Sequence, residues 1–180
     1  IRDSYYTRHD PCYEYQVNDG CIKLYFPFRN KHTANRFITN NKCPLENLDS
    51  LANTTYKLIV KSQKDKMLIL RLLKELRIND VGVYVIASET AKLPDDIVDV
   101  LRKTTKSKVY VMLDTDNTGL TSAIEYEKNY GFTALFMTKG YSAKDPTDLV
   151  RITDYNFVKK KFANMYLNEI VNGKERRVVS

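Results

Sequence analysis

Histidine and cysteine are scarce in this 180-residue sequence, and long apolar runs are missing from it. Its three cysteines, Cys12, Cys21 and Cys43, are too irregularly spaced for a zinc ribbon and too few for a disulfide framework. His9 and His32 have no neighbouring ligand pattern, which favours a solvated or structural role for both. No stretch approaches the roughly 20 apolar residues of a membrane span, and no signal peptide is visible. These absences predict a cytoplasmic protein with reduced thiols and no membrane partner.

Positive charge is in excess, with 29 Lys and Arg against 22 Asp and Glu and a net charge of +7. This balance favours a polyanionic partner, nucleic acid first and an acidic membrane surface second. The length suits one medium domain or a domain with a small lobe. The chain opens with Ile1 rather than Met, so we expect it to be excised from a longer protein.

The chain changes character near residue 54. Residues 1–54 are rich in Tyr, Asn, Arg and Lys, with short β-like runs at 21–26 and 36–40, and predict a small basic α+β lobe. Apolar strands then alternate with helical patterns, which predicts an α/β domain over 55–151 with a mostly parallel sheet flanked by helices. The strands are expected at 56–60, 81–87, 109–113 and 133–138, and the helices at 64–76, 93–101 and 120–129. A C-terminal helix and basic tail are expected over 152–180.

The predicted strand at 109–113 ends in two carboxylates, Asp114 and Asp116. Residues two apart share a face of an ideal strand. Paired carboxylates without nearby His or Cys suit Mg²⁺ or Mn²⁺ better than zinc. The alternative is a strand end followed by a polar turn and a helix N-cap, since Asp and Asn are common in both.

Acids follow the other predicted strands as well. The carboxyl ends of parallel strands form one edge of the sheet, where α/β proteins bind ligands. Carboxylates gathered there repel one another unless a cation holds them, so the set indicates a metal site of the kind used in phosphoryl or nucleotidyl transfer. The further members of this set are Asp65, Glu89, Asp145 and Asp148.

The N-terminal lobe combines cations with aromatic residues, as single-stranded nucleic-acid surfaces do. We expect Phe26 and Phe37 to be core residues, and Arg29 and Arg36 to contact nucleic acid. The cations are Lys23, Arg29, Lys31, Arg36 and Lys42, and the aromatics are Tyr25, Phe26, Phe28 and Phe37.

Three segments resemble the Toprim domain, the metal-binding fold of DNA primases, topoisomerases and some nucleases. Asp114-Thr-Asp-Asn-Thr-Gly119 matches its Asp-x-Asp-x-x-Gly motif, Asp65 matches an upstream Asp, and Lys144-Asp-Pro-Thr-Asp148 resembles the acidic Asp-Pro segment of primases. Upstream, Gly20-Cys-Ile-Lys-Leu-Tyr-Phe-Pro-Phe-Arg29 is similar to a primase segment that runs from Gly through a strand into Arg. The likeness covers roughly residues 18–151 and is closest to primases of the phage or plasmid type.

The resemblance implies a metal-dependent enzyme that synthesises RNA primers on single-stranded DNA during replication. Implied partners are the template, nucleoside triphosphates and a replicative helicase, either separate or in the same polypeptide. A phage-encoded protein would act in the host-cell cytoplasm. The implied catalytic residues are Asp114, Asp116 and Asp65, to which we add Glu89 as a hypothesis of our own. The implied metal ligands are Asp114, Asp116, Asp145 and Asp148, and the candidate phosphate contacts are Lys61, Lys64, Gly119 and Lys144.

One departure from the family pattern concerns the Glu-Gly that ends a Toprim strand, since Lys61-Ser62 stands there instead. A charged lysine cannot ligate Mg²⁺; it can hold a phosphate, or it can pair with Asp114 or Asp116 and neutralise the site. We hypothesise that Glu89 supplies the missing carboxylate, and that Asp148 replaces an acid expected at Thr147. Two other functions stay open: a nuclease or topoisomerase-like activity, and a non-catalytic nucleic-acid-binding module.

Overall fold

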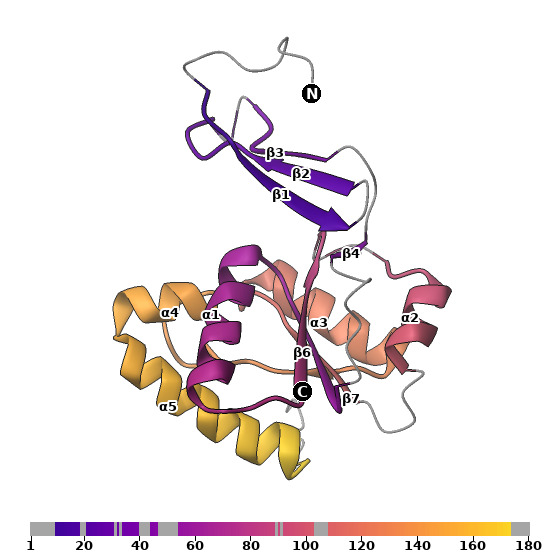
Figure 1. The fold of residues 1–180 in the computed structure, drawn as a ribbon, viewed down its shortest axis with the longest axis vertical. Coiled ribbons are helices and arrows are strands. Elements are labelled where there is room, and N and C mark those ends of the chain that lie inside the picture. Colours follow the sequence, from indigo (N-terminus) through magenta and orange to yellow (C-terminus); the bar gives the residue numbers. More distant parts are fainter. Residues whose placement is uncertain are drawn as a thin grey trace.

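The computed structural model describes residues 10–18, 21–30, 32, 34–39, 44–46, 54–88, 90, 92–102 and 108–173. They form two sheets, a small one of three strands and a larger one of five. Figure 1 shows the small sheet standing above the larger one, which carries helices on both faces. Among these residues, no helix is long and apolar enough to cross a lipid bilayer.

The small sheet is antiparallel and consists of β1 (Tyr13–Asn18), β2 (Cys21–Tyr25) and β3 (Phe37–Thr39). The sequence analysis predicts β2 and β3 but not β1, although Tyr13, Tyr15 and Val17 alternate with polar residues along it. Leu24 and Phe26 are buried, as alternation in β2 predicts. The described residues of the lobe form strands and turns, so its predicted helical part has no counterpart among them.

The larger sheet has the order β4-β6-β5-β7-β8, and all its pairs are parallel except that of β4 with β6. This confirms the mostly parallel sheet. Its central strands are buried on both faces, which explains their nearly continuous apolar sequences. The fourth predicted strand is shorter than expected because turns take over after Phe136. The strands are β4 (Leu45–Glu46), β5 (Tyr56–Val60), β6 (Val81–Ile86), β7 (Lys108–Met112) and β8 (Thr133–Ala134).

Helices cover both faces of this sheet, which confirms the predicted α/β architecture (Figure 1). A hydrophobic core lies on each face of the sheet, and successive residues of β5 point into the two cores alternately. Leu58 and Val60 pack on one face, and Ile59 packs on the other. The first face carries α1 (Gln63–Glu75), α4 (Pro146–Ile152), α5 (Tyr155–Met165) and the π-helical η3 (Tyr166–Val171). The second carries α2 (Asp95–Arg102) and α3 (Asn117–Tyr130).

The leucine-rich sequence of α1 predicts a broad apolar face that would include Met67 and Leu70, and the structure shows that this is wrong in part. Met67 is 70% exposed and Leu70 is 44% exposed. The buried side of α1 runs instead through Asp65, Ile69 and Leu72, together with Leu73. A leucine-rich helix leaves several possible faces, and packing against the sheet selects one of them.

Both ends of the sheet domain draw on residues outside 55–151. Strand β4 lies in the stretch predicted as the lobe, and it pairs with β6 of the large sheet. Beyond residue 151, Val158, Phe162 and Ile170 are fully buried in the same core as β5. The sheet domain is therefore completed by segments from both sides of the predicted boundaries.

Candidate functional site

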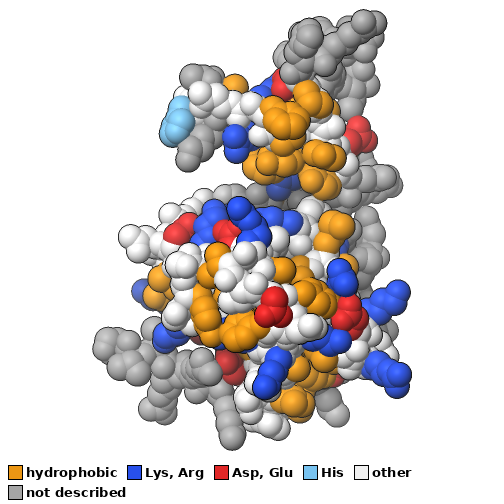
Figure 2. Space-filling model, turned by 90° about the vertical axis from the view of Figure 1, so that its left-hand side faces the viewer, with side chains coloured by type: hydrophobic (Ala, Val, Ile, Leu, Met, Phe, Trp, Pro, Cys, Tyr) orange, Lys and Arg blue, Asp and Glu red, His pale blue; other side chains and the backbone are white. Residues whose placement is uncertain are grey.

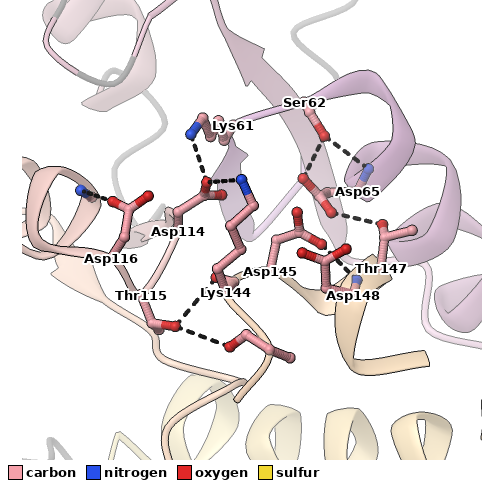
Figure 3. Close-up of polar contacts among 12 residues, drawn as sticks. Lys61, Ser62, Asp65, Asp114, Thr115, Asp116, Lys144, Asp145, Thr147 and Asp148 are labelled. Carbon is pink, nitrogen blue, oxygen red and sulfur yellow. Dashed lines mark hydrogen bonds and ion pairs between the residues drawn. The ribbon is translucent and has the colours of Figure 1, made fainter. Parts of the chain in front are cut away.

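The candidate site lies at the carboxyl edge of the large sheet, where β5 and β7 end and α1, α3 and α4 begin. Figure 3 shows its carboxylates and lysines facing one another across this edge. Three of the carboxylates, Asp65, Asp114 and Asp145, are each only 2% exposed. A carboxylate this deeply buried needs a charged or hydrogen-bonding partner. The partners show what each acid does.

Asp114 is held by two lysines. The Lys61 ammonium lies 2.6 Å from Asp114 Oδ2, and the Lys144 ammonium lies 3.6 Å from the same oxygen. The Lys61 side chain keeps 33% of its surface exposed, so this pair sits at the border between the interior and the solvent. Of the two roles considered for Lys61, the ion pair with Asp114 is thus the one present in this state.

Asp116 serves as the N-cap of α3 rather than as the partner of Asp114. Its Oδ1 accepts a hydrogen bond of 3.0 Å from the Gly119 amide. The prediction that Asp114 and Asp116 share a strand face is wrong, because β7 ends at Met112 and the alternation stops there. Figure 3 shows Asp116 turned toward α3 and Asp114 turned toward Lys61 and Lys144.

Gly119 is required by packing at the start of α3. A Cβ added to this residue would overlap the backbone carbonyl oxygen of Asp114. Its amide, a predicted phosphate contact, donates to Asp116 in this structure. The glycine of the Asp-x-Asp-x-x-Gly motif therefore has a purely steric reason to be there.

Asp65 lies in the first turn of α1 and accepts hydroxyl hydrogen bonds on both oxygens. Ser62 bonds to Oδ2, and Thr147 bonds to Oδ1 at 2.8 Å. Burial raises the pKa of Asp65, and the nearby charge of Asp145 adds to this, while the two hydroxyls only partly offset the shift. A protonated Asp65 is therefore easier to form here than in water.

Asp145 joins Lys64 to the start of α4. Its Oδ2 lies 2.5 Å from the Lys64 ammonium, and its Oδ1 accepts 2.7 Å from the Asp148 amide as the α4 N-cap. Burial lowers the pKa of Lys64, but the hydrogen bond and charge of Asp145 outweigh this, and the pKa is raised overall. Asp148 itself is more open, with 23% of its side chain exposed, and lies 3.4 Å from Arg151.

Two hydroxyl residues that the sequence analysis did not single out anchor the loop before α4. Thr115 N donates to the Lys144 carbonyl at 2.8 Å, and its hydroxyl lies 2.9 Å from that of Thr138. These bonds hold Lys144 and Asp145 against the end of β7. The role of Thr115 and Thr138 could not be predicted from the sequence, because their contacts join distant segments.

The role of Ser62 could have been predicted from the sequence, since a Ser three residues before an Asp at the start of a helix is typical of an N-cap, and Ser62 caps α1.

Carboxylate oxygens are suitable ligands for a hard divalent cation, but in this structure lysine ammonium groups balance their negative charge. Among the described residues, no three Asp, Glu, His or Cys side chains are grouped to bind a metal. Buried Asp114 and Asp145 show that this edge needs cations, and Lys61 and Lys64 now supply them. Mg²⁺ or Mn²⁺ would therefore have to displace an ammonium group. Glu89, the proposed extra carboxylate, lies outside the described residues.

A cleft of about 570 Å³ separates this edge from the lobe. Figure 2 shows the hollow between the upper and lower parts, with Lys and Arg side chains along its lower border. Among the described residues that line it, three are lysines and none is an acid. From the lobe these are Tyr15, Lys23, Tyr25 and Phe37; from the sheet edge they are Lys61, Ser62, Gln63, Lys64, Ala87, Ser88, Thr90 and Thr118.

The two arginines of the lobe that the structure describes, Arg29 and Arg36, make intramolecular contacts. Arg29 bonds to Asp10 through Nε at 2.9 Å and Nη2 at 2.6 Å, and it covers the Phe26 ring at 3.4 Å from the centroid. Arg36 Nε donates to the Arg29 carbonyl at 2.6 Å. The predicted nucleic-acid contact Lys31 lies outside the described residues.

Phe26 and Phe37 have opposite environments. Phe26 is fully buried, which confirms its prediction as core, whereas Phe37 is 55% exposed, so the core prediction for it is wrong. Phe37 is on β3, stacked on Tyr25 of β2, with ring centroids 4.7 Å apart. One strand of three residues gives no alternation from which its outward face could be read.

Comparisons with known proteins bear on the fold. No family model matches the chain, and no curated protein matches its sequence. A solved structure is similar: bacteriophage T7 lagging-strand DNA polymerase interacting with primase domains of two gp4 subunits, bound to an RNA/DNA hybrid and dTTP. The likeness has a TM-score of 0.58 at 13% identity and covers 87% of this chain and 76% of the other. At this identity the comparison shows a primase-like fold.

Proposed function

We propose that this chain is the catalytic core of a DNA primase of the phage or plasmid type, built on a Toprim domain. It would join ribonucleotides into primers on single-stranded DNA, acting in the cytoplasm with a replicative helicase as a partner. The observation that carries this proposal is the cleft, which places three lysines from two subdomains beside the acids of the sheet edge. The fold likeness to primase domains bound to an RNA/DNA hybrid and dTTP supports the same reading.

The arrangement can receive a polyanion without rebuilding the fold. Lys61 and Lys64 keep 33% and 50% of their side chains exposed, so their ammonium groups can reach phosphates in the cleft. Lys144, which is 55% exposed, lies on the other side of Asp114. A triphosphate that attracts these lysines leaves their carboxylates in need of another cation. Exchange of lysine for metal at the acids is thus coupled to nucleotide binding in this proposal.

The proposed cofactor is Mg²⁺ or Mn²⁺, which would stabilise charge on the attacking and leaving oxygens. The residues proposed to hold it are Asp114, Asp116, Asp145 and Asp148, with Asp65 and Glu89 as neighbouring acids. The chain's own lysines would orient the triphosphate. Asp116 would have to bind the metal while it caps α3. Only its Oδ1 accepts the capping hydrogen bond from Gly119, so Oδ2 could serve as the ligand.

Primer synthesis on single-stranded DNA with nucleoside triphosphates and Mg²⁺ or Mn²⁺ tests the proposal. Asp114→Asn keeps the size of the side chain and should reduce product formation about a hundred-fold or more. Asp99→Asn is the matched control, because Asp99 is exposed on α2 away from the site, and it should retain activity. Thermal melting of both variants separates loss of chemistry from loss of folding. Strand cleavage without synthesis would replace the proposal with a nuclease.

The Lys61–Asp114 pair favours a second candidate, a nucleic-acid-binding module whose acids no longer take a metal. Lys61→Ala removes the competing ammonium. If the chain is a metal-dependent enzyme, we expect the wild-type protein to bind Mn²⁺ when it is titrated in the presence of triphosphate. We expect the Lys61→Ala variant to bind triphosphate several-fold more weakly than the wild type. A module binds single-stranded DNA but neither binds Mn²⁺ nor synthesises primers, with or without the substitution.

A further inference from the structure

The face of the small sheet that looks into the cleft is aromatic. Tyr13, Tyr25 and Phe37 stand directly opposite one another across β1, β2 and β3. Their rings form one stack, with centroids 6.4 Å apart between Tyr13 and Tyr25 and 4.7 Å apart between Tyr25 and Phe37. Adjacent rings are inclined by only 22° and 17°. We call these three residues the aromatic ladder.

Cross-strand aromatic pairs stabilise sheets, so packing alone could explain a ladder. The apolar interior of the lobe, however, is on the opposite face, where Leu24 and Phe26 are buried. The two end rings of the ladder remain open, with Tyr13 61% exposed and Phe37 55% exposed. Large exposed rings gathered on one face of a small sheet indicate a binding surface.

Charge selects the occupant of this surface. Lys23 lies on the same face and places its ammonium 5.2 Å from the centroid of the Phe37 ring. Across the cleft stand Lys61 and Lys64, and the lining residues that the structure describes include no acid. Flat rings beside cations match the alternating bases and phosphates of a single strand.

We propose that the aromatic ladder is a stacking platform for the bases of single-stranded DNA, with Lys23 on one wall and Lys61 and Lys64 on the other facing its phosphates. This inference rests on the proposed function and assigns the stacking contact with the template strand to Tyr13 and Phe37, because Tyr25 is stacked between their rings. It also moves that contact away from Arg29 and Arg36, whose guanidinium groups are engaged within the lobe. A stacking platform accepts any base, because every base has a π-face.

Two oligonucleotides of equal length and charge separate stacking from phosphate binding: labelled oligothymidylate, and the same chain with abasic sites in place of thymines. Fluorescence anisotropy measures their affinities for the 180-residue chain. Base–aromatic stacking predicts that the wild-type chain binds oligothymidylate about ten-fold or more tightly than the abasic chain. Equal affinities would overturn the platform.

Substitution of Phe37 tests the ladder itself. Phe37→Leu keeps an apolar side chain but removes the ring, and should abolish most of the preference for oligothymidylate, while Phe37→Tyr should retain it. The control is Phe157→Leu, since Phe157 is 37% exposed on α5, outside the cleft. An unchanged preference in Phe37→Leu would also reject the inference.

The outcomes distinguish this inference from the proposed function. If the wild-type chain binds neither oligonucleotide and makes no primers, the proposed function fails. If primers are made and both oligonucleotides bind equally well, only the stacking platform fails, and the exposed ladder would then be a contact for another protein.

Discussion

The two walls of the cleft differ in how many of their side chains already have hydrogen-bonding or charged partners within the protein. On the sheet edge, buried Asp65, Asp114 and Asp145 each have hydroxyl or lysine partners. On the lobe, the rings of Tyr13 and Phe37 are more than half exposed. A ligand must therefore exchange partners on the sheet edge, whereas on the lobe it only covers open surface. The first wall favours selective binding of charge, and the second favours tolerant binding of flat groups.

The largest expected effect concerns the rigidity of the sheet edge. Gly119→Ala would force a Cβ against the Asp114 carbonyl oxygen, which should lower the free energy of unfolding by about 4 kcal/mol. Thr121→Ala, at an exposed position of the same helix, is the control and should have little effect. Denaturant unfolding measures both. A Gly119→Ala variant as stable as the wild-type chain would show that this edge is as adaptable as the lobe.

The two faces of the small sheet provide a matched pair of substitutions. Phe26→Ala removes a fully buried ring and should cost the lobe about 3 kcal/mol. Phe37→Ala removes a ring that is 55% exposed and should cost about 1 kcal/mol or less. Hydrogen exchange of the β2 amides reports the stability of the lobe in each variant. Equal losses would mean that the aromatic ladder is part of the core.

A double-mutant cycle on Arg29 and Asp10 sharpens the role of the lobe cations. Arg29→Ala removes two hydrogen bonds to Asp10, and the two groups should show a coupling energy of about 1 kcal/mol in stability. The slope of single-strand affinity against salt should stay the same in Arg29→Ala and fall by about one in Lys23→Gln. A lower slope in Arg29→Ala would restore the arginine as a phosphate contact.

The smallest expected effect concerns Asp65. Because burial raises its folded-state pKa above the unfolded value of about 3.9, the folded chain holds the proton more tightly. Its contribution to stability is present below that value and is lost as the pH rises through the folded pKa. Asp65→Asn removes this slope and should change stability at pH 7 by about 1 kcal/mol or less. Unfolding curves at several pH values measure this.

Primer synthesis by the same variant tells the two roles of Asp65 apart. An unchanged rate with the loss of the pH slope would make Asp65 a structural link between α1 and α4 through Thr147. A large loss of rate at unchanged stability would place it among the acids that act on the ligand.

Much of the sheet domain could be predicted from local pattern. Apolar β-branched runs predicted β5, β6 and β7 within a residue or so at each end. Gly131, with φ of 65°, ends α3 in the left-handed conformation that favours glycine. Strand β1 was missed although Tyr13, Tyr15 and Val17 give it a two-residue alternation; only its pairing with β2 shows that this short segment is a strand. Helix α4 has a short apolar pattern, and its position is decided by Asp145 as its cap and by Leu149 in the core.

Local sequence is enough to show which carboxylates and ammonium groups follow the strands. Nearly continuous apolar runs are typical of strands in a parallel sheet, and the carboxyl ends of such strands meet at one edge. The sequence by itself could not determine the partners of these groups. A carboxylate after a strand can cap a helix, pair with a lysine or bind a metal, and the choice depends on groups far away in the chain. Only the tertiary structure joined Lys61 to Asp114, Thr147 to Asp65 and Lys64 to Asp145. It also turned Phe37 outward into the cleft, since sheet register, not residue type, decides which face a side chain occupies.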